Sequence, residues 1–322
     1  MKLRSFASFV APSVVLMLLL LALPLAMTVW LSTRNCTLDM ETVTVTQTGP
    51  FGARESTTQR ARLDADGRAA QACRHVGLDY YRKVLGLGSG NREGENEFRS
   101  ALRFTLLYVA GTTPFVLVGG MLLALGMNRV TQRLKGAFIA ASLLPFIVTP
   151  VVGALAIKWL FRDNGLVPHV LEIFGVQLYW MAQAWSAQLL IVLYGIWHVL
   201  PFAFIVFYAG LQGVPQDALE AATIDGASRW QKLRYVTLPH LMPLIGFVTL
   251  IHLMDAYRVF EPVVVLTQGA FTTSVQYLTY HVLLQEGNPY KASAAAVLTV
   301  AGIAVLLVPL LRKTWREQRH GH

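Results

Sequence analysis

Residues 216–239 read QDALEAATIDGASRWQKLRYVTLP and form a polar segment between two strongly apolar stretches. Asp217 or a neighbour can cap a short helix whose first turn holds Glu220, where a carboxylate favours the positive end of the helix. Gly226 interrupts that helix, and Pro239 restricts its neighbour where the next apolar stretch starts. The segment is therefore predicted to be a short helix, a bend and a second helix across one face of a membrane. Its small alanine side chains permit close approach by another protein.

The composition on either side of this segment is that of a membrane protein. Of the 322 residues, 54% are hydrophobic and 14% charged, whereas about a quarter of a soluble domain is charged. This argues against a soluble enzyme. A formal charge of +9 in so apolar a chain indicates basic cytoplasmic loops rather than nucleic-acid binding.

Six stretches approach the roughly 20 apolar residues that a helix needs to cross the hydrocarbon core. We expect helices there, because backbone in a bilayer must satisfy its own hydrogen bonds. The stretches are 5–33, 104–128, 136–157, 185–209, 241–266 (interrupted by charges) and 292–311. The first of them could instead be a cleaved signal peptide, but its length and the lack of a convincing cleavage site favour a retained anchor.

The short loops predict the orientation. With the amino terminus inside, the cytoplasmic segments hold twelve basic and four acidic residues, whereas the two short outer loops show no basic excess. Basic residues accumulate on the cytoplasmic side. We therefore expect both termini in the cytoplasm and the polar stretch 34–103 outside.

The outer stretch contains both cysteines, Cys36 and Cys73. In an oxidising compartment a disulfide between them is favoured. Two unrelated thiols remain the alternative, because spacing alone does not show that the Cα atoms approach each other.

The segment between the fourth and fifth stretches contains a string of residues at fixed spacing: Glu220, Ala221, Ala222, Asp225, Gly226 and Ala227, then Thr237, Leu238 and Pro239. This string resembles the EAA motif of ABC importer permeases, in particular the carbohydrate-uptake branch related to the maltose permeases. The resemblance extends over about 104–311 and includes Trp197, Pro201 and Pro215. Two departures from the family are the insertion at 34–103 and the residues Gln268 to Phe271 in place of a Gly-Gly-Pro exit.

The resemblance implies an all-α integral membrane protein with six transmembrane helices and the type I importer permease fold. The expected parts are 1–33 (tail and first span), 34–103 (extracytoplasmic insertion), 104–311 (permease core with a coupling loop at 211–240) and 312–322 (cytoplasmic tail). The location would be the cytoplasmic (inner) membrane.

The resemblance also implies partners. A separate ABC ATPase dimer would bind ATP and Mg and hydrolyse the ATP, since this chain has no phosphate-binding Gly-x-x-x-x-Gly-Lys-Ser/Thr motif, no catalytic residue and no cofactor of its own. Glu220 would contact that ATPase, Gly226 would permit the bend, and Leu238 with Pro239 would fix the return to the membrane. A second permease subunit, expected to be a homologous chain, and an extracytoplasmic solute-binding protein would complete the complex. The alternative for the loop is an amphipathic segment that only lies on the lipid.

The expected substrate path lies in the fourth and fifth spans. Asp255, Arg258 and Glu261 are three residues apart, which places them along one helical flank. Intramembrane charges are costly and usually face a cavity or pair with one another. They either bind sugar hydroxyls or form an ion-pair ladder that only orders the helix. Tyr194 and Trp197 either stack on a sugar ring or pack in the core; the nearby His198 has no partner at metal-ligand spacing, so we expect no metal.

The expected function is the permease subunit of an importer for a sugar or sugar-like solute. A non-sugar cargo such as a glycerol-phosphate-type compound is the first alternative. A secondary transporter is the second, and it would carry its own coupling-ion site.

Overall fold

The computed structural model describes residues 3–49, 52–63, 67, 70–87, 94–162, 164–175 and 179–319. The chain divides into two compact units. One comprises residues 1–95 and 282–298, and the other comprises 96–281 and 299–322. Each unit is described by itself.

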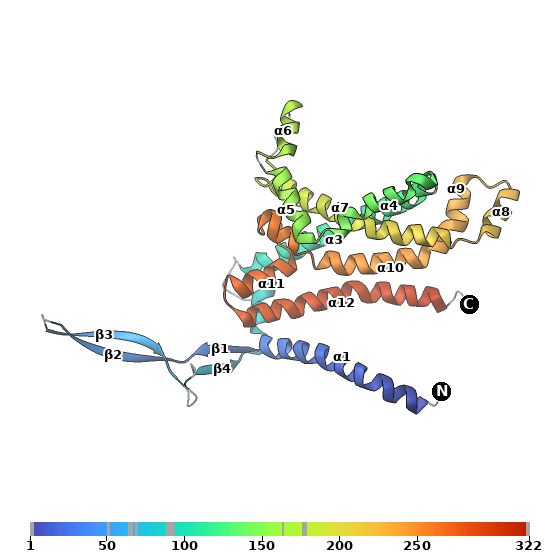
Figure 1. The fold of residues 1–322 in the computed structure, drawn as a ribbon. Helices are drawn as coiled ribbons and strands as arrows, with labels where there is room; N and C mark the ends of the chain where they lie inside the picture. The colour runs from blue at the N-terminus through green and yellow to red at the C-terminus, as the bar shows by residue number, and fades with distance from the viewer. Residues whose placement is uncertain are drawn as a thin grey trace. The chain divides into compact units, whose positions relative to one another are not determined.

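In the described part of the chain, five continuous helical runs are long and apolar enough to cross a membrane. Three of them are single helices that cover the first (as far as residue 32), fourth and sixth predicted stretches: α1 (Leu3–Ser32), α7 (Ala184–Gln212) and α12 (Pro289–Arg319) (Figure 1). The second predicted span lies in α3 (Gly94–Met127), which begins before the expected boundary of the insertion at residue 103.

The fifth run combines three consecutive elements without a break. These are α9 (Arg229–Lys232), the π-helix η1 (Leu233–Thr237) and α10 (Leu238–Tyr257). The sequence predicts that the second helix of the polar segment is a separate helix across the membrane face. In the structure it is instead continuous with a run long and apolar enough to cross a membrane. Pro239 lies inside this run. The wider π-turn just before it makes room for a proline ring that would otherwise clash with a preceding carbonyl.

The third predicted span, 136–157, is not one continuous helix. It consists of α4 (Gln132–Ile147) and α5 (Pro150–Phe161), and α6 (Leu166–Ile173) follows. The chain bends by 93° between α4 on one side and α5 with α6 on the other. Val148 and Thr149 are extended, with ψ of 130° and 143°. For Thr149 the cause is Pro150, because the residue directly before a proline disfavours the helical conformation. Counted as one broken span, this pair raises the number of candidate spans to six.

The fifth predicted span, 241–266, is also interrupted. α10 ends at Tyr257, where the amides of Arg258 and Val259 bond to carbonyls three residues earlier and tighten the last turn. A second π-helix, η2 (Val263–Thr267), follows this break. It leads through Gln268, in the left-handed conformation, to α11 (Val275–Leu284).

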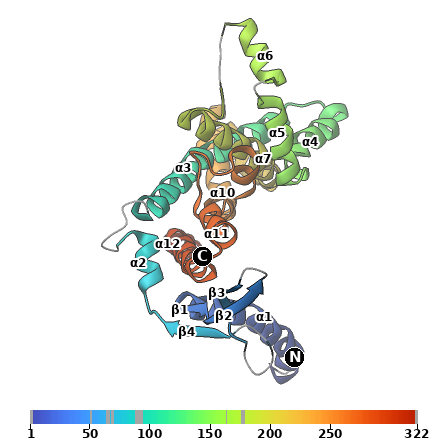
Figure 2. The same cartoon turned by 90° about the vertical axis from the view of Figure 1, so that its left-hand side faces the viewer.

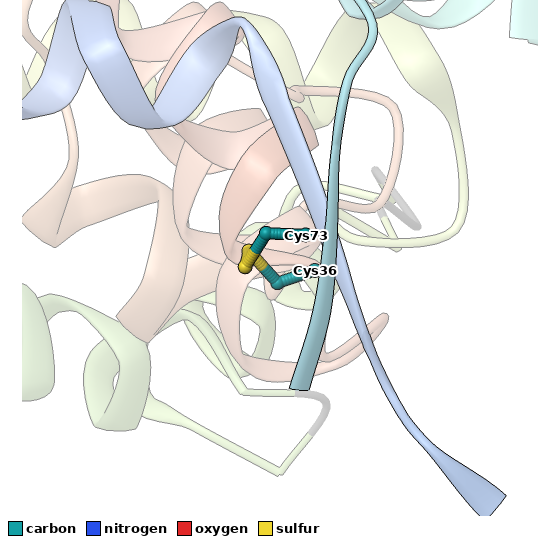
Figure 3. Close-up of a disulfide and its surroundings, with 2 residues drawn as sticks. All are labelled: Cys36 and Cys73. Carbon is teal, nitrogen blue, oxygen red and sulfur yellow. A yellow bond between two sulfur atoms is a disulfide. The ribbon is translucent and has the colours of Figure 1, made fainter. Parts of the chain in front are cut away.

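The insertion within the first unit is built from two antiparallel strand pairs. β1 (Arg34–Leu38) pairs with β4 (Gln71–His75), and β2 (Met40–Gly49) pairs with β3 (Gly52–Ala61). A short helix α2 (Asp79–Leu85) follows β4 (Figure 2). Cys36 lies directly opposite Cys73 in the β1–β4 register, with Cα atoms 4.0 Å apart, and the two side chains form a disulfide (Figure 3).

The core of the second unit is centred on α7, which contacts α4, α5 and α10. Its large side chains Leu190, Ile191, Phe204 and Phe207 are fully buried. Gly195 lets the ring of Tyr108 from α3 approach the helix, since a Cβ there would overlap that ring. Tyr108 and Gly195, where α3 and α7 approach closely, both line a cavity of this unit.

Candidate functional site

The helix α8 (Gln216–Ile224) overlaps the EAA-like string and ends within it in a regular C-terminal cap. Gly226 is in the left-handed conformation, with φ of 76°. Its amide bonds to the carbonyl of Thr223 at 3.1 Å, and the amide of Ala227 bonds to the carbonyl of Ala222 at 2.9 Å. These two bonds form a Schellman motif, in which glycine is favoured because other residues resist positive φ.

The next helix, α9, begins with an N-terminal cap at Ser228, two residues after Gly226. Ser228 caps α9: its side chain accepts from the amide of Gln231, whose own side chain accepts from the amide of Ser228. This capping box satisfies two amides at the start of the helix. Lys232 donates to the hydroxyl of Thr223 at 2.7 Å and ties α9 back to α8. The sequence of this loop therefore specifies a helix, a sharp turn and a second helix.

The start of α8 differs from the prediction. The residue that precedes it is Pro215, and no side chain caps the helix. Asp217 lies in the first turn, and Glu220 follows in the second turn. The favourable position at the positive end of the helix therefore belongs to Asp217 and not to Glu220.

The loop, whose helices α8 and α9 are labelled in Figure 1, exposes both polar and apolar side chains. Glu220, Ala221, Asp225 and Gly226 are exposed. The side chain of Ile224 is 87% exposed. Glu220 makes no ion pair with any other described residue, so its carboxylate is available to a partner.

A cavity of about 370 Å³ lies in the second unit, between α3, α7, α10 and the two helix breaks. Its volume is within the range of small-molecule sites, roughly 300 to 1,000 Å³. The residues that line it are Tyr108, Phe146, Pro150, Tyr194, Gly195, His198, Val199, Phe202, Ile251, His252, Asp255, Ala256, Arg258, Val259, Glu261 and Pro262. Four of the five predicted path residues are among them; Trp197, which is 42% exposed, is not.

The predicted charges line this cavity from different elements. Asp255 lies in the last turn of α10, Arg258 is the capping residue just after the end of that helix, and Glu261 follows the break. The expectation that all three lie along one helical flank is wrong, because the helix ends at Tyr257. No ion pair joins any two of them within the described residues. The ion-pair ladder is thus not formed, and both carboxylates and the guanidinium remain available to a solute.

Four of the lining residues, Phe146, Tyr194, His198 and Phe202, form an aromatic wall. The His198 ring stacks on Tyr194, with centroids 5.7 Å apart and planes 7° apart, and lies 6.2 Å from Phe146. Phe146 stacks in turn on Phe202 at 5.7 Å. Flat apolar faces of this kind suit the C–H face of a sugar ring, as they do other ligands with an apolar body.

Hydrogen bonds to the α4–α5 break hold two of these rings in place. Tyr194 Oη donates to the carbonyl of Pro150 at 2.7 Å. His198 Nδ1 lies 2.8 Å from the carbonyl of Pro145. A carbonyl can only accept, so Nδ1 carries the proton and Nε2 is an acceptor. The helix break thus positions the aromatic wall.

Sequence reasoning missed several residues of this site. Phe146, His252 and Tyr108 come from three different helices, and nothing in their spacing links them to Tyr194. One signal was available for the helix break, because Thr149-Pro150 interrupts an apolar run. Among the described residues, no group of three His, Cys, Asp or Glu side chains lies close enough to hold a metal.

Comparisons with known proteins agree with this architecture. Residues 85–319 match the family described as binding-protein-dependent transport system inner membrane component. The trehalose/maltose transport system permease of Thermococcus litoralis is 32% identical over 231 residues, which are 70% of this chain and 74% of that protein. The trehalose transport system permease of Mycobacterium tuberculosis H37Rv is 29% identical over 298 residues, 92% of this chain and 84% of that protein.

Solved structures share the fold. A chain of the bacterial alginate ABC transporter, in complex with an alginate-pentasaccharide-bound periplasmic protein, is similar with a TM-score of 0.64 and 26% identity. The similarity covers 74% of this chain and 83% of that one. The shared fold is that of type I ABC importer permeases, in which ATP is hydrolysed by a separate subunit. The chain belongs to the family of inner-membrane permease components of binding-protein-dependent ABC transport systems.

Proposed function

We propose that this permease carries a neutral sugar, a mono-, di- or short oligosaccharide, through the cavity between α3, α7 and α10. The observation that carries the proposal is that the aromatic wall and Asp255, Arg258 and Glu261 line the same cavity of about 370 Å³. Carboxylates and a guanidinium supply hydrogen bonds to hydroxyl groups, and the wall covers the apolar ring face. Relatives named for trehalose and maltose transport support the same cargo class.

The charge of the cavity argues against an anionic cargo. Two carboxylates and one guanidinium line it, so a phosphate or uronate would meet net repulsion in a site of low dielectric. A glycerol-phosphate-type solute is therefore disfavoured. A neutral polyol or sugar meets no such penalty.

The loop between α7 and α10 supplies the coupling. A separate ATPase dimer, which binds ATP and Mg, would receive α8 with its exposed Glu220, Ala221 and Ile224. Closure of that dimer would move the loop and shift the permease between two states. Leu238 and Pro239, at the start of α10, would carry this movement into the membrane.

The remaining partners follow from the family. A second permease, which we take to be a homologous chain, would complete the pathway, and an extracytoplasmic solute-binding protein would deliver the sugar. The alginate transporter was solved with such a periplasmic protein. The basic cytoplasmic loops support an orientation with both termini inside, which places the disulfide-bonded insertion in the oxidising compartment.

The test is transport by the complete complex in proteoliposomes. The chain would be reconstituted with its second permease and ATPase, and uptake of radiolabelled trehalose, maltose, arabinotriose and glycerol 3-phosphate would be followed with binding protein outside and ATP inside. We expect sugar uptake that needs both ATP and binding protein. Uptake of glycerol 3-phosphate alone would refute the sugar assignment, and ion-driven uptake by this chain alone would refute the importer mechanism.

A pair of variants on one helix tests the cavity itself. Phe146→Ala removes a ring of the aromatic wall, whereas Phe138→Ala removes an exposed ring of α4 that does not line the cavity. We expect Phe146→Ala to raise the KM for sugar and Phe138→Ala to leave it unchanged. Equal KM values for the two variants would place the path elsewhere.

A further inference from the structure

His252 is a buried histidine in the wall of the cavity with one unsatisfied nitrogen. It belongs to α10, is 1% exposed and is among the cavity-lining residues. Its Nε2 lies 3.1 Å from the hydroxyl of Thr112 on α3. Its Nδ1 has no hydrogen-bond partner. The only other such buried side-chain atom among the described residues is Trp180 Nε1, outside the cavity.

The hydrogen bonds of Thr112 determine the tautomer of this histidine. The Thr112 hydroxyl donates its single proton to the carbonyl of Tyr108 at 2.8 Å. Toward His252 it can therefore only accept, so Nε2 carries the ring proton. Nδ1 is left with a bare lone pair and is an acceptor without a donor.

An unsatisfied acceptor at this position is an exception that needs a reason, since most buried polar atoms are paired. A leucine or phenylalanine would fill the same space without the penalty of burying an unpaired nitrogen. The cavity beside the ring offers the reason. His252 lines this cavity, so a donor in the cavity reaches Nδ1 once the protein atoms that cover the nitrogen move aside.

We propose that His252 Nδ1 accepts a hydrogen bond from one hydroxyl group of the transported sugar and thereby determines which sugars pass. This inference rests on the proposed sugar function. Nδ1 is covered by protein atoms in this structure, so the bond forms when the pathway opens around its cargo. The ring is a specificity-determining group, and Thr112 is the positioning residue that holds its tautomer.

The experiment compares a sugar hydroxyl with the histidine in one double-mutant cycle. The probes are trehalose, maltose and arabinotriose, each with its set of monodeoxy analogues, and the measured quantity is KM for uptake by the reconstituted complex. For the wild type, removal of one particular hydroxyl should raise KM roughly tenfold, because a buried acceptor loses its donor. His252→Phe should show the same rise with the parent sugar and no additional rise with that analogue.

Further variants separate recognition from structure. His252→Gln keeps an acceptor and should restore part of the preference, and Thr112→Val should weaken the same single hydroxyl dependence by freeing the tautomer. Trp180→Phe is the matched control, because it removes the other unpartnered buried group without touching the cavity. It should leave every analogue ratio unchanged. If His252→Phe fails to assemble, Thr112→Val carries the same comparison.

The outcomes are distinguishable. If His252→Phe and Thr112→Val keep the wild-type penalty for every analogue, the inference is overturned while sugar transport stands. If the wild-type complex transports none of the sugars, the proposed function falls and this inference with it. A single hydroxyl whose effect disappears in His252→Phe supports the assignment.

Discussion

Replacing Gly226 by alanine tests whether the backbone of the EAA-like loop is needed for coupling. Gly226 has φ of 76°, and a Cβ built there has no atom within 4 Å. Alanine would therefore meet no steric obstacle, and its whole cost is the left-handed backbone, roughly 1 to 2 kcal/mol for a residue with a Cβ. We expect the equilibrium constant for forming the turn to fall by roughly 5- to 30-fold, which is the upper limit for the fall in its population.

The assay is binding of the purified ATPase to the reconstituted permease pair, followed by sugar uptake. If the ATPase recognises the turn as it stands in this structure, its apparent affinity should fall by the same factor as the population of the turn. Maximal binding should be retained, because the variant still reaches the competent conformation. Uptake at limiting ATPase should decrease in proportion.

Gly175→Ala is the matched control. Gly175 also ends a helix, α6, with φ of 74° and no atom within 4 Å of a built Cβ, and its amide bonds to the carbonyl of Glu172 at 2.9 Å. The backbone penalty is thus the same, but α6 is not part of the loop between α7 and α10. Unchanged ATPase affinity in Gly226→Ala, or equal losses in both variants, would refute the claim that this turn is the contact.

Three further predictions concern the loop and the insertion. Glu220→Lys should abolish ATPase association and uptake, whereas Gln216→Lys, one turn earlier on the same exposed helix, should retain both; intact coupling in Glu220→Lys would show that the carboxylate is not a contact. Ser228→Ala removes the capping box at a cost of about 1 kcal/mol, so ATPase affinity should fall by roughly fivefold, and Ser228→Asp should recover it. The double variant Cys36→Ser, Cys73→Ser loses a cross-link between residues 37 apart, worth about 4 kcal/mol in the chain-entropy estimate. Trypsin should then cleave the insertion much faster, and a reductant should produce the same acceleration in the wild type but none in the variant.

The sequence predicts the long helices well where one physical requirement dominates. α1, α7 and α12 match the apolar runs expected for them to within one residue or enclose them, because a single apolar segment in a bilayer satisfies its backbone hydrogen bonds only as a helix. The Gly226 turn is also local, since one residue with positive φ ends the helix. The charge pattern of the loops, by contrast, predicts an orientation that the fold alone does not test.

The helix breaks are less predictable. Asp255, Arg258 and Glu261 fit a helical spacing, yet α10 stops between the first two of them. Thr149 and Pro150 lie within an apolar run long enough to span, yet the chain bends by 93° there. In both places the backbone leaves the helix where it borders the cavity, and such breaks are tolerated at membrane depth only beside protein or a cavity. Tertiary context, not local propensity, decides them.

The cavity itself could not be derived from one sequence. Phe146 and His198 are 52 positions apart and meet only because α4 packs on α7. His252 gives no signal at all in the sequence, since its importance rests on which proton Thr112 holds. These are properties of packing and hydrogen-bond direction, which composition and spacing do not encode.

The helix α8 and the helix α9 differ in how they connect to their neighbours, and this difference bears on how the proposed coupling movement would reach the cavity. α8 is separated from α7 by residues 213–215 and from α9 by the Gly226 turn, so it can move as a separate element. α9, η1 and α10 form one run of 29 residues, about 43 Å long at the usual rise. Ser228 caps its first turn, and His252 and Asp255 lie near its other end, in the cavity wall. Because Lys232 of α9 is hydrogen-bonded to Thr223 of α8, a displacement of α8 would pull on this long helix and move the cavity residues unless the helix bends. The π-turn before Pro239 keeps the helix continuous where a proline would otherwise break it.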